Sequence, residues 1–197
     1  TYPNFIAKDD LALDKLGEIY PVGTIVQRYR NFLKWLTDTF RTTEIEFRRE
    51  IFSSLEIPNG ARILVTGAGT GEDIRFLVKD LKRTDLKIHF QDASEEMISY
   101  TVESFIKDEI SFEECNVSNA SILPYQSDIF DCVIHFGGIN YFSEKKLAID
   151  EMHRVCKPKG QILFGDEGVA PWLRKTEYGK MMILNNSLWV AQPPLEF

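Results

Sequence analysis

The sequence has few cysteines, no long apolar run and few positive charges, and each shortage excludes a class of protein. Its three cysteines, Cys115, Cys132 and Cys156, have no C-x-x-C spacing and lie in apolar segments. This pattern excludes a disulfide framework and a cysteine-based zinc site, and it predicts reduced core thiols in a cytoplasmic protein. We expect no metal site. We also expect no membrane partner, because no apolar run approaches the roughly 18 residues of a membrane helix.

The charge balance argues against a nucleic acid as partner. Lys and Arg number 23 against 30 Asp and Glu among 197 residues, which gives a formal net charge of −7. A phosphate backbone attracts basic surfaces, so a small-molecule partner is favoured. The sequence is rich in apolar material, because 44% of its residues are hydrophobic, enough for the core of one globular domain.

Residues 1–57 are predicted to form a helical segment, followed by a second domain at residues 58–197. Apolar residues recur at helical spacing between Ile25 and Phe40, which indicates an amphipathic helix. Thr43, with Glu46 three residues later, has the pattern of a capping box that begins the next helix. Pro58-Asn59-Gly60 then breaks the helical pattern.

Beyond residue 60, short apolar runs alternate with amphipathic stretches. The predicted strands are residues 62–66, 87–91, 110–115, 130–136 and 160–165. This alternation is typical of an α/β protein with a doubly wound, mostly parallel sheet and helices on both faces. Ligands of such sheets bind beyond the carboxyl ends of the strands, near the point where the strand order reverses.

A glycine-rich turn follows the first of these strands. The sequence ILVTGAGTGED (63–73) has glycine at every second position, as Gly67, Gly69 and Gly71. A dinucleotide fingerprint, G-x-G-x-x-G, needs its third glycine where Glu72 stands. Glu72 and Asp73 would also repel a pyrophosphate at the start of the next helix, so a cofactor without phosphates, S-adenosylmethionine (SAM), is favoured over NAD.

Four motifs, in their order along the chain, resemble one family. They are GAGTG (67–71), QDASEEMI (91–98), NASILPYQSDIFDCV (119–133) and INYFSEKKLAIDEMHRVCKPKGQILF (139–164). Together they resemble the class I SAM-dependent methyltransferases, and within them the methyltransferase type 11 branch that contains the ubiquinone/menaquinone-biosynthesis C-methyltransferases. The resemblance covers about residues 60–167. It implies a Rossmann-like methyltransferase fold, with SAM as the cofactor and an N-terminal helical lid.

The resemblance also implies which residues hold the cofactor. The glycine turn would line its methionine part, Asp92 would accept hydrogen bonds from the ribose hydroxyls, and Asn119 would lie at the adenine edge. A register counted from Phe112 would give the adenine role to Asn116 instead. The expected cofactor-binding residues are Gly67, Ala68, Gly69, Gly71, Asp92, Ala93, Met97, Asn119, Ala120, His135, Phe136, Gly137 and, from the helical segment, Tyr29.

The sequence departs from the family pattern near both ends of the matched region. Most members carry an acid two residues before the first glycine, where this chain has Val65, and Glu72 or Asp73 is the candidate replacement. The K-P-G-G turn of the family reads Lys157-Pro158-Lys159-Gly160 here, which should change the turn chemistry slightly.

The predicted function is transfer of a methyl group from SAM to a small or medium-sized acceptor. Candidates for a catalytic role in proton transfer are His135, which ends a predicted strand, and Asp166 and Glu167, which follow another. Two alternatives remain. One is a non-catalytic SAM-fold binding or interaction protein, which Val65 keeps open, and the less favoured one is an NAD-dependent dehydrogenase.

The end of the chain leads to a further expectation. The family fold completes its sheet after the fifth strand with a helix and an antiparallel hairpin. Residues 171–185 can supply the helix, but the few that remain include Pro193-Pro194 and cannot form two strands. We therefore expect the C-terminal strands to be missing from this chain. An exposed sheet edge would then favour a homo-oligomer.

Overall fold

A five-stranded parallel sheet forms the centre of the protein in a computed structural model, which describes residues 2–6, 23–166, 168–185 and 187–190. The strand order is β3-β2-β1-β4-β5, and every neighbouring pair is parallel. The strands are β1 (Arg62–Thr66), β2 (Lys87–Asp92), β3 (Glu114–Val117), β4 (Phe130–Phe136) and β5 (Cys156–Gly165). The strand order reverses between β1 and β4, so a ligand site is expected at their carboxyl ends.

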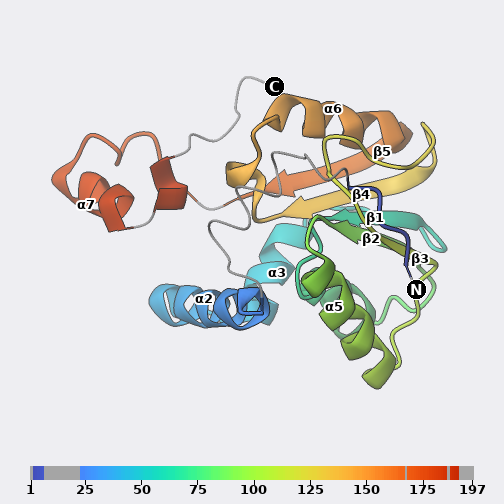
Figure 1. The fold of residues 1–197 in the computed structure, drawn as a ribbon. Helices are drawn as coiled ribbons and strands as arrows, with labels where there is room; N and C mark the ends of the chain where they lie inside the picture. The colour runs from blue at the N-terminus through green and yellow to red at the C-terminus, as the bar shows by residue number, and fades with distance from the viewer. Residues whose placement is uncertain (1, 7–22, 167, 186, 191–197) are drawn as a thin grey trace.

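Helices cover both faces of this sheet, as Figure 1 shows. On one face lie α3 (Glu44–Phe52), α4 (Glu72–Arg75) with its π-helical continuation η1 (Phe76–Asp80), and α5 (Glu95–Lys107). On the other face lies α6 (Lys145–Val155). The predicted doubly wound α/β class is therefore confirmed.

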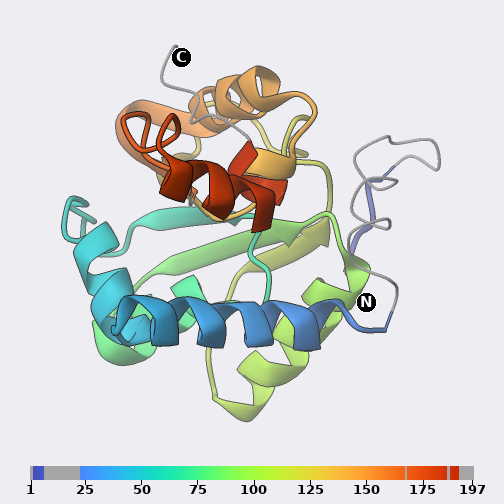
Figure 2. The same ribbon diagram turned by 90° about the vertical axis from the view of Figure 1, so that its left-hand side faces the viewer.

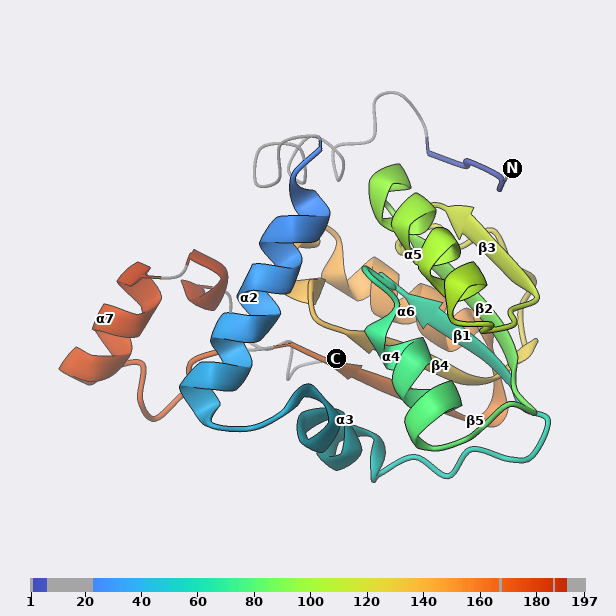
Figure 3. The ribbon, with the colours of Figure 1, turned by 90° about the horizontal axis from the view of Figure 1, so that it is seen from below.

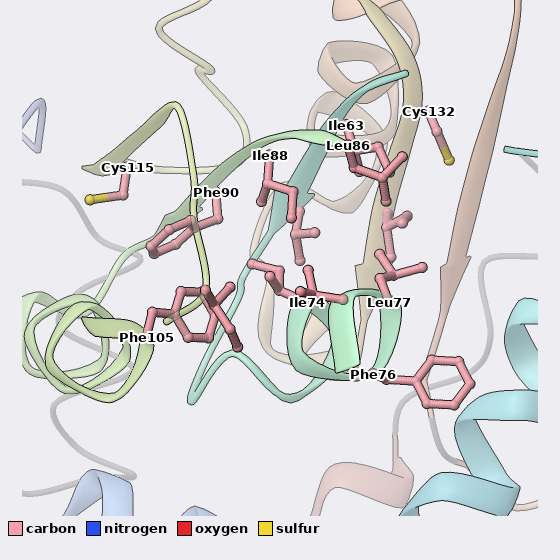
Figure 4. Packing of buried hydrophobic residues seen from close by; sticks show 14 of the residues in the cluster. Ile63, Ile74, Phe76, Leu77, Leu86, Ile88, Phe90, Phe105, Cys115 and Cys132 are labelled. Carbon is pink, nitrogen blue, oxygen red and sulfur yellow. The ribbon is translucent and has the colours of Figure 1, made fainter. Parts of the chain in front are cut away.

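The two faces bury separate apolar clusters. Ile63 of β1 and Phe90 of β2 face α4 and α5, where the Phe90 and Phe105 rings lie 5.6 Å apart (Figure 4). Leu64 and Met152 belong to the cluster on the α6 side. Since alternate side chains of β1 point to opposite covered faces, its central residues Ile63, Leu64 and Val65 form one continuous apolar run.

The N-terminal helical segment is only partly as predicted. Helix α2 (Ile25–Phe40) runs lengthwise below the strands in Figure 2, and α3 begins at the predicted capping box. Thr43 Oγ1 accepts from the Glu46 amide at 3.2 Å, and the Glu46 carboxylate accepts from the Thr43 amide at 3.0 Å. The boundary at residue 57 falls between α3 and β1, and the division into two domains stays a prediction.

Residues 2–6 are not helical, which corrects the prediction for the start of the chain. The Val117 amide donates to the Pro3 carbonyl at 2.9 Å, and the Phe5 amide donates to the Val117 carbonyl at 2.8 Å. The physical reason is that β3 is an edge strand, whose unpaired backbone groups bind an extended segment. Residues 7–22, also predicted as helical, lie outside the described residues.

Strand β3 begins later than predicted because the end of α5 extends into the apolar run. Glu109 has a φ of +55°, and the Ile110 amide donates to the Phe105 carbonyl at 2.9 Å. These features close the helix, so Ile110 belongs to its end. Pairing with β2 follows at Glu113, whose amide donates to the Ile88 carbonyl.

The C-terminal region contains a shorter helix than predicted. Helix α7 spans Glu177–Asn185, and the short helix η3 spans Ser187–Val190. Thr176 begins α7, because its Oγ1 accepts from the Gly179 amide at 3.0 Å as an N-cap does. No strand follows β5 in the part of the chain that the structure describes, and Pro193-Pro194 lie outside that part.

The turn expected at residues 157–160 lies inside β5. The pairing of β4 with β5 shifts there, since Phe130 pairs with Cys156 and Cys132 with Gln161. Lys159, where the family has glycine, has a φ of +68° in the left-handed region.

Among the described residues, no helix is long and apolar enough to cross a membrane.

Candidate functional site

The carboxyl ends of β1, β2 and β4 open into one pocket. Its space is about 1330 Å³, including a part that is open to solvent. Helix α2 lies beyond these strand ends (Figure 3) and contributes to the wall. The lining residues are Ile25, Tyr29, Phe32, Leu33, Leu36, Phe47, Arg48, Gly67, Gly69, Asp73, Gln91, Asp92, Ala93, Met97, Ser118, Asn119, Ala120, Ser121, His135, Phe136, Gly137, Gly138, Phe142 and Ser143.

The glycine turn forms one wall of this pocket and needs its glycines. Gly67, Gly69 and Gly71 all have positive φ, between +54° and +81°. A Cβ at Gly71 would lie 2.6 Å from the Phe105 ring, so α5 can pack against the turn only without a side chain there. At Gly69 the nearest atoms belong to the Tyr29 ring, 3.7 Å from an added Cβ. Tyr29 of α2 thus lies beside the turn, and its contact with the cofactor stays a prediction.

Asp92, at the end of β2, is bound to the same turn. Its Oδ2 accepts from the Gly69 amide and its Oδ1 from the Ser94 amide, both at 2.8 Å. Burial raises the pKa of this carboxyl group, and the hydrogen bonds from the backbone oppose that effect. A carboxylate has about four acceptor sites, so Asp92 can still accept a hydrogen bond from a ligand.

The two candidates for the adenine edge lie in different places. Asn119 lines the pocket, with its Oδ1 accepting from the Ser121 amide at 2.9 Å. Asn116 is fully buried in β3, where its Nδ2 donates to the Tyr125 hydroxyl at 2.7 Å, and it does not line the pocket. The geometry therefore favours the register that counts Asn119.

His135, at the end of β4, is buried with one defined tautomer. Its Nδ1 lies 3.0 Å from the Thr66 carbonyl oxygen, which can only accept, so Nδ1 carries the proton and Nε2 carries the lone pair. Burial lowers the pKa of His135, while the bond to Thr66 and the charge of Asp166 oppose that effect. Within the described residues, Nε2 has no hydrogen-bond partner.

Several predicted site residues do not line the pocket. The Ala68 amide donates to the Gln91 carbonyl at 2.9 Å, and Gly71 packs on α5, so both shape the turn without facing the pocket. Asp166 accepts from the Asn140 amide at 2.8 Å outside the pocket lining. Glu167 lies outside the described residues. The described part of the chain contains no cluster of three or more His, Cys, Asp or Glu side chains that could hold a metal ion.

Sequence reasoning missed Arg48, which lines the pocket from α3. Its Nε donates to Asp73 Oδ1 at 2.9 Å, and its Nη1 donates to Glu44 at 3.0 Å. Burial raises the pKa of Asp73, and the guanidinium of Arg48 opposes that effect. The signal available in the sequence is weak: Arg48 shares a helix face with Glu44 and Phe52, four residues away on either side.

A further part of the pocket wall is apolar, and of its residues only Phe136 was predicted. This part comes from the helical segment, from the last residue of β4 and from the segment after β4. These residues are Ile25, Phe32, Leu33, Leu36, Phe47, Phe136 and Phe142. The pocket thus has a polar half, built from the glycine turn, Asp92 and Asn119, and an apolar half under α2 and α3.

Comparison with known proteins identifies the same region of the chain. Residues 63–160 match the family model for the methyltransferase domain. The ubiquinone/menaquinone biosynthesis C-methyltransferase UbiE of Xylella fastidiosa (strain M12) is 29% identical over 134 residues. The match covers 65% of this chain and 51% of that protein, so the chain spans about half the length of this curated relative.

Solved structures share the fold at lower identity. The YcgJ protein of Bacillus subtilis has a TM-score of 0.62 at 21% identity, covering 76% of this chain and 62% of that one. The [4+2]-cyclase SpnF has a TM-score of 0.55 at 22% identity, covering 60% of this chain and 43% of that one. Fold, ordered motifs and domain match agree, and the chain belongs to the class I SAM-dependent methyltransferase family.

Proposed function

We propose that this protein is a SAM-dependent methyltransferase that acts on a small or medium-sized acceptor. The observation that carries the proposal is one hydrogen bond of 2.8 Å from the Gly69 amide to Asp92. It joins the carboxyl ends of β1 and β2, next to the point between β1 and β4 where the strand order reverses. The buried carboxylate keeps lone pairs for the hydroxyls of a ribose, and the bare glycine backbone admits a ligand at close range.

The polar half of the pocket fits the cofactor of this family. Gly67 and Gly69 would line the methionine part, Asp92 the ribose, and Asn119 with Ala93 and Met97 the adenine. These roles are supported by the fact that all six residues line the same pocket. When bound, SAM supplies a methyl group that its sulfonium has already activated.

The chain itself then has to orient the acceptor and exclude water. Phe32 and Phe47 from the helical segment, with Phe136 and Phe142 from the sheet side, offer apolar contacts for the acceptor. The lone pair of His135 Nε2 can hold a proton if the acceptor has to lose one. A small-molecule acceptor and a cytoplasmic location, which the three buried free cysteines favour, are parts of this proposal.

A second candidate is a protein that keeps the SAM fold without methyl transfer. Two observations favour keeping it: Val65 replaces the acid of the family pattern, and the cyclase SpnF shares the fold. An NAD-dependent dehydrogenase is less favoured, because Glu72 stands where the dinucleotide fingerprint needs glycine.

Titration calorimetry with the demethylated product S-adenosylhomocysteine (SAH) and with NAD tests the proposal. SAH should bind saturably and NAD should not. Asp92→Asn should weaken SAH binding by roughly 10- to 100-fold, because hydrogen bonds to a charged group are lost. Asp150→Asn, an exposed acid on α6, is the control and should bind SAH like the wild type.

Activity needs a separate measurement. Transfer of a labelled methyl group from SAM into fractions of a metabolite extract would identify the acceptor. Saturable binding of NAD with none of SAH would refute the proposal, and tight SAH binding without any transfer would favour the second candidate.

A further inference from the structure

An ion pair joins the helical segment to the polar half of the pocket. Arg48 of α3 and Asp73 of α4 lie 2.9 Å apart, and their side chains are only 9% and 14% exposed. Both line the pocket. Removing two charges from water is costly, so the pair by itself is weak evidence for a gain in stability.

The hydrogen-bonding capacity of this pair is not used up. Arg48 donates a hydrogen bond from Nε to Asp73 Oδ1 and another from Nη1 to Glu44. Across the described residues, no hydrogen bond involves Asp73 Oδ2 or Arg48 Nη2. One carboxylate oxygen and one guanidinium nitrogen of the pair therefore remain available to a ligand. Such a pair complements a zwitterion, because the carboxylate can bind its ammonium group and the guanidinium can bind its carboxylate group.

Asp73 is the candidate replacement for the acid that the chain lacks at residue 65. Val65 is 1% exposed in the apolar core and cannot accept a hydrogen bond through its side chain. Asp73 lies two residues beyond the last glycine of the same turn, in the first turn of α4. The other candidate, Glu72, pairs with Arg75 at 3.4 Å and does not line the pocket.

Resting on the function proposed above, we propose that the Arg48–Asp73 pair recognises the zwitterionic amino-acid end of the cofactor, in place of an acid at the end of β1. Asp73 accepts from the α-ammonium group, and Arg48 donates to the α-carboxylate. Half of this subsite then comes from the helical segment, so a bound cofactor holds α3 against α4.

Three ligands separate the contributions by calorimetry. SAH has the complete amino-acid end, its decarboxylated analogue keeps only the ammonium, and 5′-methylthioadenosine has neither charge. Arg48→Met and Asp73→Asn should each weaken SAH binding by roughly 10- to 100-fold and leave methylthioadenosine within about threefold of the wild type. Arg48→Met should barely change binding of the decarboxylated analogue, whereas Asp73→Asn should weaken it.

Glu72→Gln is the matched control, because it removes a neighbouring acid outside the pocket lining and should leave all three affinities unchanged. Methylthioadenosine binding serves as the check that each variant still folds. The inference is overturned if the wild type binds SAH no more tightly than methylthioadenosine, or if both variants bind SAH normally. A wild type that binds none of the three ligands overturns the proposed function itself.

Discussion

Among single residues, His135 combines full burial with a fixed tautomer. It is 1% exposed, and its proton on Nδ1 is held by the Thr66 carbonyl. Because burial lowers its pKa below the ordinary value of 6.5, the imidazole stays neutral in the folded protein at neutral pH. The neutral ring can accept a proton at Nε2, which suits the role predicted for it.

The lowered pKa of His135 predicts a pH dependence of stability. Below pH 6.5 the unfolded chain binds a proton that the folded protein does not, so the free energy of unfolding falls as the pH falls from 7 to 5. His135→Asn keeps a donor for the Thr66 carbonyl but cannot titrate. The free energy of unfolding of this variant should therefore fall less over the same pH range. Urea unfolding at several pH values measures the difference. Other groups titrate in both proteins, so only the difference between the two proteins reports on His135. If the free energy of unfolding of both depends on pH in the same way, the lowered pKa of His135 is contradicted.

Among the elements, β1 and β4 were predicted with their observed bounds, and the capping box of α3 was read correctly. These features are local, since a strand buried on both faces shows as an apolar run and a cap as two residues three apart. The predicted start of β3 was wrong, because the apolar residue Ile110 belongs to the end of α5 and not to the strand.

The site was less predictable than the sheet. The residues of the glycine turn and Asp92 follow from motifs, but the contact of Arg48 with Asp73 joins residues 25 positions apart on two helices. Helical periodicity showed that α2 has an apolar face. It could not show that this face covers the pocket beside the glycine turn, because that depends on how α2 packs against the strand ends.

The position of α2 predicts a role in binding the acceptor. Phe32 lines the apolar half of the pocket, whereas Phe40 on the same helix is 60% exposed and does not. Phe32→Ala should lower kcat/KM for the acceptor by roughly tenfold or more, through lost apolar contact, and leave the SAH affinity unchanged. Phe40→Ala is the control. Steady-state kinetics with the acceptor from the labelling screen provide the measurement, and equal effects of the two substitutions would argue against a lid.

Over the whole molecule, the C-terminal region leaves much apolar surface uncovered. Trp172 is 78% exposed and Leu184 of α7 is 86% exposed, and helix α7 lies beside the sheet, not on it (Figure 1). In the described part of the chain, β5 pairs with β4 on one side and with no strand on the other. Exposed apolar side chains and an open strand edge both favour association.

We therefore predict that the 197-residue chain self-associates, and that α7 contributes more to the contact than the edge of β5 does. Sedimentation velocity over a range of concentrations should show species larger than a monomer. Leu184→Glu should shift the distribution toward the monomer, because burial of an unpaired charge in an apolar contact costs free energy. Ile106→Glu, at a residue of α5 that is 70% exposed, is the matched control and should have no effect. If Leu184→Glu changes nothing while the wild type associates, the edge of β5 is the contact surface instead of α7. A stable wild-type monomer at high concentration would exclude both.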